Sequence, residues 1–350
     1  MRCREPMRVL FDVTHPANVH LFKGAVTVLR GRGDEVMVVS REKDVTVLLL
    51  DGLRIEHEPI SRQGRGLAGL AVELAVRTGR LYRLARWFRP HVMVAAEAGV
   101  SIGPVGAALR VPRVVFAQVD RARLQNGLGL PWATVICTGT GYCGDHGRRQ
   151  MRFRGYQAQA YLDPRRFRPD PQPLRRAGLD PDSPYIVLRL VGWRATHDLG
   201  RRGPGVERIR RAVESLERLG RVIITSESPL PEGLGAWRNP VDALAMHDLL
   251  AYSRLCVAEG GTVAMEAALL GVPAVACNAY SFGYMAALAA RGMFAVAGEL
   301  EEAVEVGARI LADSQVRANQ ARRVEQLYAE TDDVQAKMVE VISRAGEGRP

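Results

Sequence analysis

Short apolar runs alternate with helical patterns along most of the chain, and only a few residues separate one from the next. The apolar runs are rich in valine and have the length of buried strands, whereas the segments between them repeat apolar residues at helical spacing. Connections this short join each strand to a helix and that helix to a parallel neighbouring strand. The alternation therefore restricts the chain to α/β folds built on parallel sheets.

The alternation forms two series, with a proline-rich stretch between them. In the first series, strands are predicted at 7–13, 35–40, 53–58, 91–95, 113–118 and 134–138, and helices at 19–32, 43–51 and 67–88. In the second series, strands are predicted at 185–190, 221–225, 254–258 and 273–277, and helices at 205–219, 246–252, 262–270, 299–312, 314–329 and 333–345. In the helix at 67–88, one stripe that we expect to be buried contains Leu67, Leu70, Leu74, Leu81, Leu84 and Phe88.

The proline-rich stretch predicts a domain boundary. Residues 163–184 contain six prolines and little apolar periodicity, as linkers do. We therefore expect an N-terminal domain over 1–168, a linker over 169–184 and a C-terminal domain over 185–330, with a last helix over 331–350 that can return to the N-terminal domain. Both domains are expected to be Rossmann-like and doubly wound, and to face a central cleft that holds the ligand.

Composition narrows the class of protein. A chain of 350 residues with 47% hydrophobic and 25% charged residues is long and apolar enough for two folded domains, which excludes a disordered protein. No uncharged apolar run approaches the roughly 18 residues of a spanning helix. Glu5 and Asp12 interrupt the stretch where a signal peptide would be apolar. We therefore expect a cytoplasmic protein, with peripheral contact at the inner face of the membrane left open.

The five cysteines are an odd number without a CxxC pair, which is typical of reduced thiols. Cys143 and His146 lie close together in sequence, but no second ligand pair accompanies them, so we predict no metal site.

Charge is distributed unevenly between the two halves of the chain. Residues 1–168 contain 27 Lys and Arg against 14 Asp and Glu, and residues 169–350 contain 21 against 24, so the net charges are +13 and −3. All but three of the basic residues are arginine. The asymmetry predicts that the first half faces an anionic partner, such as a phosphorylated acceptor or a membrane surface, rather than nucleic acid.

The strongest local signal is the segment at 259–266, EGGTVAME, which joins a strand ending at Glu259 to a helix starting at Thr262. Two glycines allow backbone N–H groups to approach a bulky anion, and the helix N-terminus adds the positive end of its dipole. Gly260, Gly261 and Thr262 are therefore predicted to bind a diphosphate, and Glu259 is predicted to belong to the same nucleotide-sugar site. Glu266, one turn into the helix, is predicted to accept two ribose hydroxyls; the alternative is a structural turn with a solvated glutamate.

His247 and Asp248 precede the strand that ends at this turn. A loop here would border the base of a bound nucleotide, whereas Asp248 could equally cap a helix. Both interpretations stay open.

A second group of polar residues follows the first strand of the second series, where ligands of open α/β sheets bind. Arginine in this position can neutralise a leaving diphosphate, and a His–Asp pair can hold it or transfer a proton. A structural His–Asp pair is the alternative. The candidates are Arg189, Trp193, Arg194, His197 and Asp198.

The first strand of the chain ends in a corresponding position, followed by the turn-prone segment THPAN. His15 is the candidate general base there. Glu97 and Asp120 follow two further strands and can share the role of base, with surface solvation as the ordinary alternative. The candidates for binding the acceptor at this edge are Thr14, Asn18 and Arg62.

Four segments carry a wider similarity: FDVTHPANVHLFK, RFRGYQAQAYLDP, RLVGWRATHDLGRRG and MHDLLAYSRLCVAEGGTVAMEAALLGVPAV. With these segments the chain resembles the DUF354 family of bacterial and archaeal proteins, within the GT-B superfamily of glycosyltransferases and UDP-N-acetylglucosamine 2-epimerases. The resemblance implies a GT-B fold, with Gly260 and Gly261 at the donor diphosphate and Glu266 at the ribose. Relatives often have asparagine where this chain has His15, and a glutamate near Ala158, so its acid–base chemistry can differ from theirs.

The residues and the resemblance together predict a metal-independent glycosyltransferase without a cofactor. It would transfer a sugar from a nucleotide-diphosphate sugar to a hydroxyl or amine acceptor, which could be anionic or lipid-linked, in carbohydrate or natural-product biosynthesis. A nucleotide-sugar 2-epimerase is the first alternative. A non-catalytic protein that binds an anionic polymer or membrane through the arginines from Arg77 to Arg89 is the second.

Overall fold

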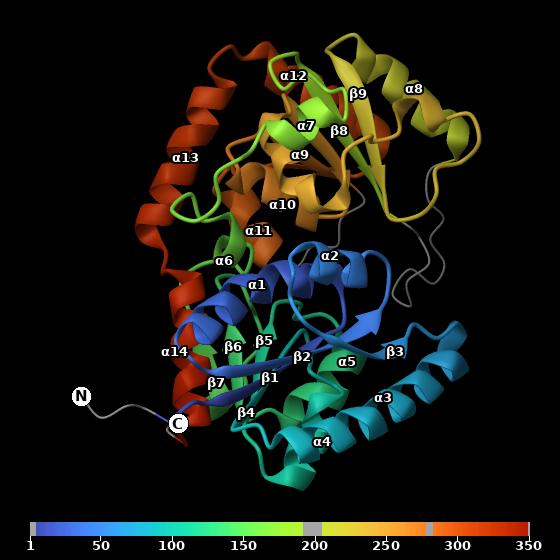
Figure 1. Ribbon diagram of the computed structural model, residues 1–350. Helices are drawn as coiled ribbons and strands as arrows, with labels where there is room; N and C mark the ends of the chain where they lie inside the picture. Colours follow the sequence, from blue (N-terminus) through green and yellow to red (C-terminus); the bar gives the residue numbers. More distant parts are fainter. Residues whose placement is uncertain (1–4, 192–204, 278–282, 349–350) are drawn as a thin grey trace. The chain divides into compact units, whose positions relative to one another are not determined.

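The computed structural model describes residues 5–191, 205–277 and 283–348. The chain divides between Asp163 and Pro164 into two compact units. Residues from Thr331 onward return to the first unit, where the last helix, α14 (Val334–Gly346), packs against α1 (Pro16–Gly31) (Figure 1). Each unit is built on one parallel sheet, so the prediction of two parallel-sheet α/β domains is confirmed.

The first unit contains a seven-stranded sheet in the order β3-β2-β1-β4-β5-β6-β7. Its strands are β1 (Arg8–Val13), β2 (Glu35–Glu42), β3 (Glu58–Arg62), β4 (Val92–Ala96), β5 (Arg113–Ala117), β6 (Val135–Thr138) and β7 (Gln150–Arg152). Besides α1 and α14, its helices are α2 (Thr46–Gly52), α3 (Gly66–Phe88), α4 (Ile102–Leu109), α5 (Arg123–Gly129) and α6 (Gln159–Leu162), with short 3-10 turns η1 (Leu130–Trp132) and η2 (Gly147–Arg149). Helices α3 and α4 and turn η1 share one buried layer against the sheet, through side chains such as Leu81, Ile102 and Leu130.

The second unit contains a five-stranded sheet in the order β12-β11-β10-β8-β9. Its strands are β8 (Tyr185–Leu190), β9 (Arg221–Ser226), β10 (Leu255–Glu259), β11 (Ala274–Cys277) and β12 (Ala295–Ala297). Its helices are α7 (Gln172–Arg176), α8 (Val206–Glu217), α9 (Met246–Tyr252), α10 (Thr262–Leu269), α11 (Gly283–Ala290), α12 (Leu300–Ala312) and α13 (Val316–Glu330), with 3-10 turns η4 (Gly235–Trp237) and η5 (Ala243–Ala245). Apolar residues of α8 and α12 cover this sheet and fill its core, among them Val213 and Ala303.

The predicted strand at 53–58 is wrong by about one strand length, because β3 begins only at Glu58. Pro59, which argues against a strand, lies within it and pairs in register with Ser40 of β2. Proline is tolerated because β3 is the edge strand of the sheet and one side of its backbone needs no partner. As a result Ser61 and Arg62, expected in a loop, are strand residues.

The predicted buried stripe of α3 is also wrong in part. Leu81 is fully buried, but Leu67 and Leu74 are 72% and 37% exposed. Two charged side chains, Glu73 and Arg77, take the buried positions instead, four residues apart and in line with Leu81. The face that α3 turns toward the sheet is therefore partly ionic.

The predicted linker contains a short helix. Helix α7 lies within 169–184 and contacts α9, and Leu174 and Leu179 are buried. Helix α4 and strands β7 and β12, which the sequence pattern did not predict, complete the two sheets and their cover. No helix among the described residues is both long and apolar enough to cross a membrane.

Candidate functional site

Each sheet has one point where its winding reverses direction. In the first unit this point lies between β1 and β4, and in the second between β8 and β10. Ligands of open parallel sheets bind beyond the carboxyl ends of the strands at such a point, where the two crossover helices diverge. Thr14 and Glu97 follow β1 and β4, and Val191 and Gly260 follow β8 and β10. Predicted site residues of both units thus lie at the positions where the topology favours a ligand.

The glycine turn of the second unit is held in place by a buried carboxylate. Glu259 is only 3% exposed, and its Oε2 accepts a hydrogen bond from the backbone N–H of Val191 (3.2 Å). This bond links the ends of β10 and β8 across the switch point. Glu259 therefore shapes the turn rather than facing solvent.

Gly260 is at φ +83°, in the left-handed region that a side chain disfavours. A Cβ on Gly260 would meet Val191 only at ordinary contact distance, 3.5 Å, so the backbone conformation is what requires glycine. On Gly261 a Cβ would overlap the end of the Met285 side chain, at 1.9 Å from its Cε.

We expect Gly260→Ala to lower the free energy of unfolding by about 1–2 kcal/mol, because alanine in the left-handed region is strained. The measurement is urea denaturation followed by circular dichroism. Gly235→Ala is the matched control, since Gly235 has an ordinary φ and open space around its Cβ position. Equal losses in the two variants would contradict the left-handed turn.

Glu266 and His247 form a buried pair in the second unit. The Nε2 of His247 lies 3.5 Å from the Oε1 of Glu266, and the side chains are 5% and 8% exposed. Helix α10 supplies Glu266 and helix α9 supplies His247. The structure brings the two residues together one helical turn beyond the glycine turn, and their membership of one nucleotide site stays a prediction.

The surroundings of His247 fix its orientation. The Phe167 ring packs edge-on against the imidazole, with centroids 6.0 Å apart and planes at 79°. Asp248 accepts a hydrogen bond from the backbone N–H of Asp170 (2.8 Å), which ties α9 to the segment preceding α7. The interpretation of Asp248 as a helix cap is wrong, because the N-cap of α9 is Ala245 and Asp248 lies within the first turn.

Arg189, on β8, forms an ion pair with Glu227 just beyond β9, with 2.9 Å between Nη2 and Oε1. Its guanidinium therefore has a carboxylate partner at the carboxyl edge of the sheet. The other four candidates of this group, Trp193, Arg194, His197 and Asp198, lie outside the described residues.

In the first unit, Thr14 and Asn18 are hydrogen-bonded to each other at the edge of the sheet that carries Glu97. The Oδ1 of Asn18 accepts hydrogen bonds from the backbone N–H and the hydroxyl of Thr14, both at 3.1 Å. The Asn18 side chain also acts to lower the pKa of the Glu97 carboxyl. Asn18 is only 3% exposed in this arrangement, and its role in binding the acceptor stays a prediction.

The backbone at Glu97 is strained. Its φ is +59°, which is uncommon for a residue with a side chain. Gly99, at φ +60°, completes the turn, and at Gly129 of α5 a Cβ would lie 2.1 Å from the carbonyl oxygen of Ala98. Close packing therefore maintains a conformation in which the Glu97 side chain leaves the end of β4 and reaches solvent.

The pKa of Glu97 is raised above its ordinary value, mainly because the surrounding protein partly desolvates the carboxyl, although the residue is exposed at the end of β4. The positive charges of Lys43 and Arg41 and the hydrogen bond from Asn18 act in the opposite direction, and the negative charge of Asp12 adds to the rise. A carboxylate with a raised pKa is a better proton acceptor than an ordinary one. Sequence reasoning missed Lys43, which follows β2 at the same edge of the sheet.

His15 caps α1. Its Nδ1 accepts a hydrogen bond from the backbone N–H of Ala17 (3.2 Å). A neutral imidazole that accepts through Nδ1 carries its proton on Nε2, which makes Nε2 a donor. In this geometry Glu97 is better suited than His15 to accept a proton.

Asp120 belongs to a separate cluster. It lies beyond β5, and its carboxylate raises the pKa of the Cys143 thiol. The Tyr142 hydroxyl contacts Nε2 of His146 (2.9 Å) beside it. The structure thus groups Asp120 with residues near β6 and not with the groups that surround Glu97. Among the described residues, no cluster of three or more His, Cys, Asp or Glu side chains could hold a metal ion.

Arg62, the remaining candidate, is exposed at the end of edge strand β3. Three strand spacings of about 4.8 Å separate β3 from β4, so the backbone of Arg62 lies roughly 14 Å from the backbone of the Glu97 turn.

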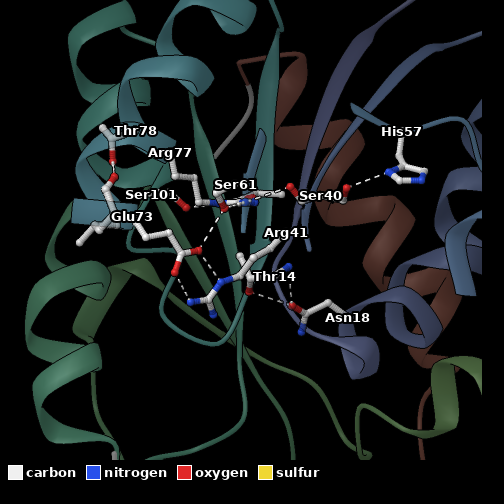
Figure 2. Close-up of polar contacts among 12 residues, drawn as sticks. Thr14, Asn18, Ser40, Arg41, His57, Ser61, Glu73, Arg77, Thr78 and Ser101 are labelled. Atoms are coloured by element: carbon white, nitrogen blue, oxygen red, sulfur yellow. Dashed lines mark hydrogen bonds and ion pairs between the residues drawn. The ribbon is translucent and has the colours of Figure 1, made fainter. Parts of the chain in front are cut away.

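A buried polar network that the sequence did not reveal supports this edge (Figure 2). Asp12, at the end of β1, accepts hydrogen bonds from Arg77 of α3 and from the hydroxyl of Ser101. Arg77 also donates to the hydroxyl of Ser61 (2.8 Å) and to the carbonyl of Ser40 (3.1 Å). The network therefore joins the ends of β1, β2 and β3 to α3.

Glu73 completes the network one helical turn away. Its two carboxylate oxygens accept from Arg41 at 2.6 and 2.5 Å, and it also accepts from the Ser61 hydroxyl and the Gly64 backbone (Figure 2). Burial acts to raise the pKa of Glu73, but these donors outweigh it and hold the pKa below its ordinary value. An acidic and a basic residue four apart, in line with Leu81 and Ala85, were the only sequence signal for this network.

Comparison with known proteins places these features in a family context. A family model described as "Protein of unknown function (DUF354)" matches residues 7–144, which confirms the resemblance over that part of the chain. The uncharacterized protein MJ0665 of Methanocaldococcus jannaschii is 24% identical over 285 residues, 77% of this chain and 81% of that protein.

Solved structures match over nearly the whole chain. UDP-GlcNAc 2-epimerase from Neisseria meningitidis bound to UDP-GlcNAc has a TM-score of 0.66 at 11% identity, over 98% of this chain and 100% of that chain. The spinosyn rhamnosyltransferase SpnG complexed with thymidine diphosphate has a TM-score of 0.64 at 18% identity, over 95% and 100%. These matches confirm the predicted GT-B fold.

Proposed function

We propose that the chain is a metal-independent glycosyltransferase that uses a nucleotide-diphosphate sugar. The observation that carries the proposal is the glycine turn between β10 and α10, with the buried Glu266–His247 pair one helical turn beyond it. In this proposal Gly260, Gly261 and Thr262 contact the diphosphate, whose charge the backbone N–H groups and the helix dipole offset. Glu266 accepts the ribose hydroxyls, and His247 orients its carboxylate.

The first unit binds the acceptor in this proposal. Glu97 removes a proton from the acceptor hydroxyl or amine, which then attacks the anomeric carbon while the bond to the diphosphate breaks. Asn18 positions the carboxylate, and Lys43 and Arg41 stabilise its charged form. The proton passes to Glu97 and the electron pair of the broken bond stays on the nucleoside diphosphate.

Nucleotide binding is the direct test. We expect one of UDP, ADP, GDP and dTDP to bind in calorimetric titrations without added metal, and Glu266→Ala to weaken it at least about tenfold, since each hydrogen bond to a charged group is worth about 1.5–3 kcal/mol. Glu266→Gln keeps the shape of the side chain and should fold where alanine does not. Glu214→Ala, an exposed glutamate on α8, is the matched control and should bind like the parent. No binding by any of the four nucleotides would contradict the proposal.

A 2-epimerase is the second candidate, because epimerases are among the structures that share this fold at the highest coverage. An epimerase needs proton donors and acceptors around one sugar, and the first unit offers two carboxyl groups, Glu97 and Asp120. Their separate surroundings favour the transferase. Incubation with the nucleotide sugar alone separates the two, because an epimerase converts it without an acceptor whereas a transferase requires one.

A further inference from the structure

Helix α3 exposes several large apolar side chains that no other part of the described chain covers, with Val72 and Val76 on the side opposite its buried residues. Its 23 residues span about 35 Å, and it lies on the outside of the first unit beside α4 (Figure 1). Large apolar side chains usually cover the core, yet six on this one helix are exposed. They are Leu67 (72%), Val72 (64%), Leu74 (37%), Val76 (44%), Tyr82 (36%) and Trp87 (75%).

The exposed charges on α3 are of one sign. Its second half carries exposed arginines at Arg80, Arg83 and Arg86, and Arg89 follows the helix. The one acidic residue between Gln63 and His91 is Glu73, which is buried against Arg41. The solvent-facing surface of α3 therefore combines apolar and basic side chains without an acidic one.

The combination of exposed apolar and basic side chains on α3 favours an anionic bilayer over a second copy of the chain as the partner. A second copy of the chain would bring the arginines of two α3 helices toward each other with no acidic group between them, which opposes association. A bilayer with anionic headgroups offers negative charge at its surface and an apolar layer just beneath it. Arginines next to an exposed tryptophan match that arrangement, because tryptophan favours the boundary between headgroups and acyl chains.

We infer that α3 binds the surface of an anionic lipid membrane. Val72 and Val76, four residues apart on the outward side of the helix, insert between the lipids, and Arg83 and Arg86 on the same side lie at the headgroups. The layer that contains α3 also exposes Leu124, Leu128 and Trp132 on α5 and η1, which extends the apolar surface of this unit.

The inference has a consequence for the acceptor, which rests on the proposed function. Helix α3 begins just after β3 and is tied through Glu73 to Arg41 and Gly64, at the carboxyl edge of the sheet. The apolar first half of α3 thus adjoins the edge that carries Glu97. An acceptor anchored in the membrane by an acyl or prenyl chain would meet this edge without leaving the lipid surface.

The test is flotation of the purified full-length chain with vesicles of phosphatidylcholine alone and of phosphatidylcholine mixed with phosphatidylglycerol. We expect binding to the anionic vesicles only, weakened by salt because the attraction is partly electrostatic. Arg83→Gln with Arg86→Gln should weaken binding about thirty-fold, since each basic side chain near an anionic surface contributes about a factor of five. Val72→Ser with Val76→Ser should weaken it at least about tenfold, because apolar insertion is lost.

Matched controls lie in the second unit. Arg218→Gln with Arg221→Gln removes the same charge from exposed positions, and Val296→Ser changes a valine that is 55% exposed; both should bind vesicles like the parent. Absence of binding to anionic vesicles, or equal losses in the α3 variants and the controls, would overturn the inference. So would a dimer in solution that the α3 variants abolish. Nucleotide titration of the same variants, expected to match the parent, separates failure of this inference from failure of the proposed function.

Discussion

Replacement of Glu97 with glutamine is expected to lower turnover of the bound nucleotide sugar about a hundredfold to ten-thousandfold, with nucleotide affinity unchanged. The amide cannot accept the acceptor's proton, and a positioned general base contributes a factor of that size. The measurement is the rate of nucleoside diphosphate release in the presence of acceptor, for the nucleotide that calorimetry identifies. Unchanged turnover would remove Glu97 from the reaction.

The pH dependence of kcat/KM tests more specifically whether Glu97 accepts the proton. Because the pKa of Glu97 is raised, kcat/KM should fall with decreasing pH at values above the ordinary glutamate pKa of 4.5. Lys43 lowers the pKa of Glu97, so Lys43→Met should raise that pKa and move the acid limb of the profile to higher pH. Lys337→Met is the matched control, since Lys337 pairs with Glu340 on α14 and should leave the limb in place.

The same assay decides between Glu97 and His15. Asparagine at position 15 preserves the helix cap, because its side chain can accept from the backbone of the first turn. If His15 serves only as the cap of α1, His15→Asn should retain turnover within a few fold of the parent. A loss as large as that of Glu97→Gln would return the role of base to His15.

Local sequence patterns were sufficient to predict the parts of the fold that depend on residues close together in the chain. The alternation of strands and helices predicted both sheets, because a short connection leaves a strand–helix–strand segment few alternatives. The glycine turn at Gly260 was readable because its conformation and the helix after it are set within a few residues. The pairing of Glu266 with His247, 19 positions earlier, was implied only as membership of one site.

The side-chain positions that the sequence did not reveal are determined by contacts between residues far apart in the chain. The apolar periodicity of α3 predicted a leucine face toward the sheet, but Arg77 turns inward because its partner Asp12 lies at the end of β1, 65 residues away. Asn18 was expected to bind a hydroxyl, and the sequence did not show that its oxygen accepts from the backbone and the hydroxyl of Thr14. The role of Arg77 depends on which strand ends the sheet order brings together, and local periodicity carries no information about that order.

The buried ion pair leads to the largest expected effect on stability. Arg77→Met should lower the free energy of unfolding by about 3–5 kcal/mol, because it leaves the Asp12 carboxylate buried without its cation. Asp12 is 1% exposed, so water cannot replace the guanidinium. The measurement is urea denaturation followed by circular dichroism and by the fluorescence of Trp87 and Trp132, the tryptophans of the first unit.

Arg83→Met on the same helix is the matched control, since Arg83 is exposed and its replacement should change stability by no more than about 0.5 kcal/mol. Asp12→Asn together with Arg77→Met should cost less than the two single changes added, because the double variant buries no unpaired charge. Additive losses would mean that the two side chains do not interact in solution. Because Asp12 lies in β1 two residues before Thr14, this ion pair also fixes the strand end that leads to Thr14 and Asn18, beside the Glu97 edge. Arg77→Met should therefore lower turnover as well as stability, which neither the exposed control nor a purely local role of Arg77 would produce.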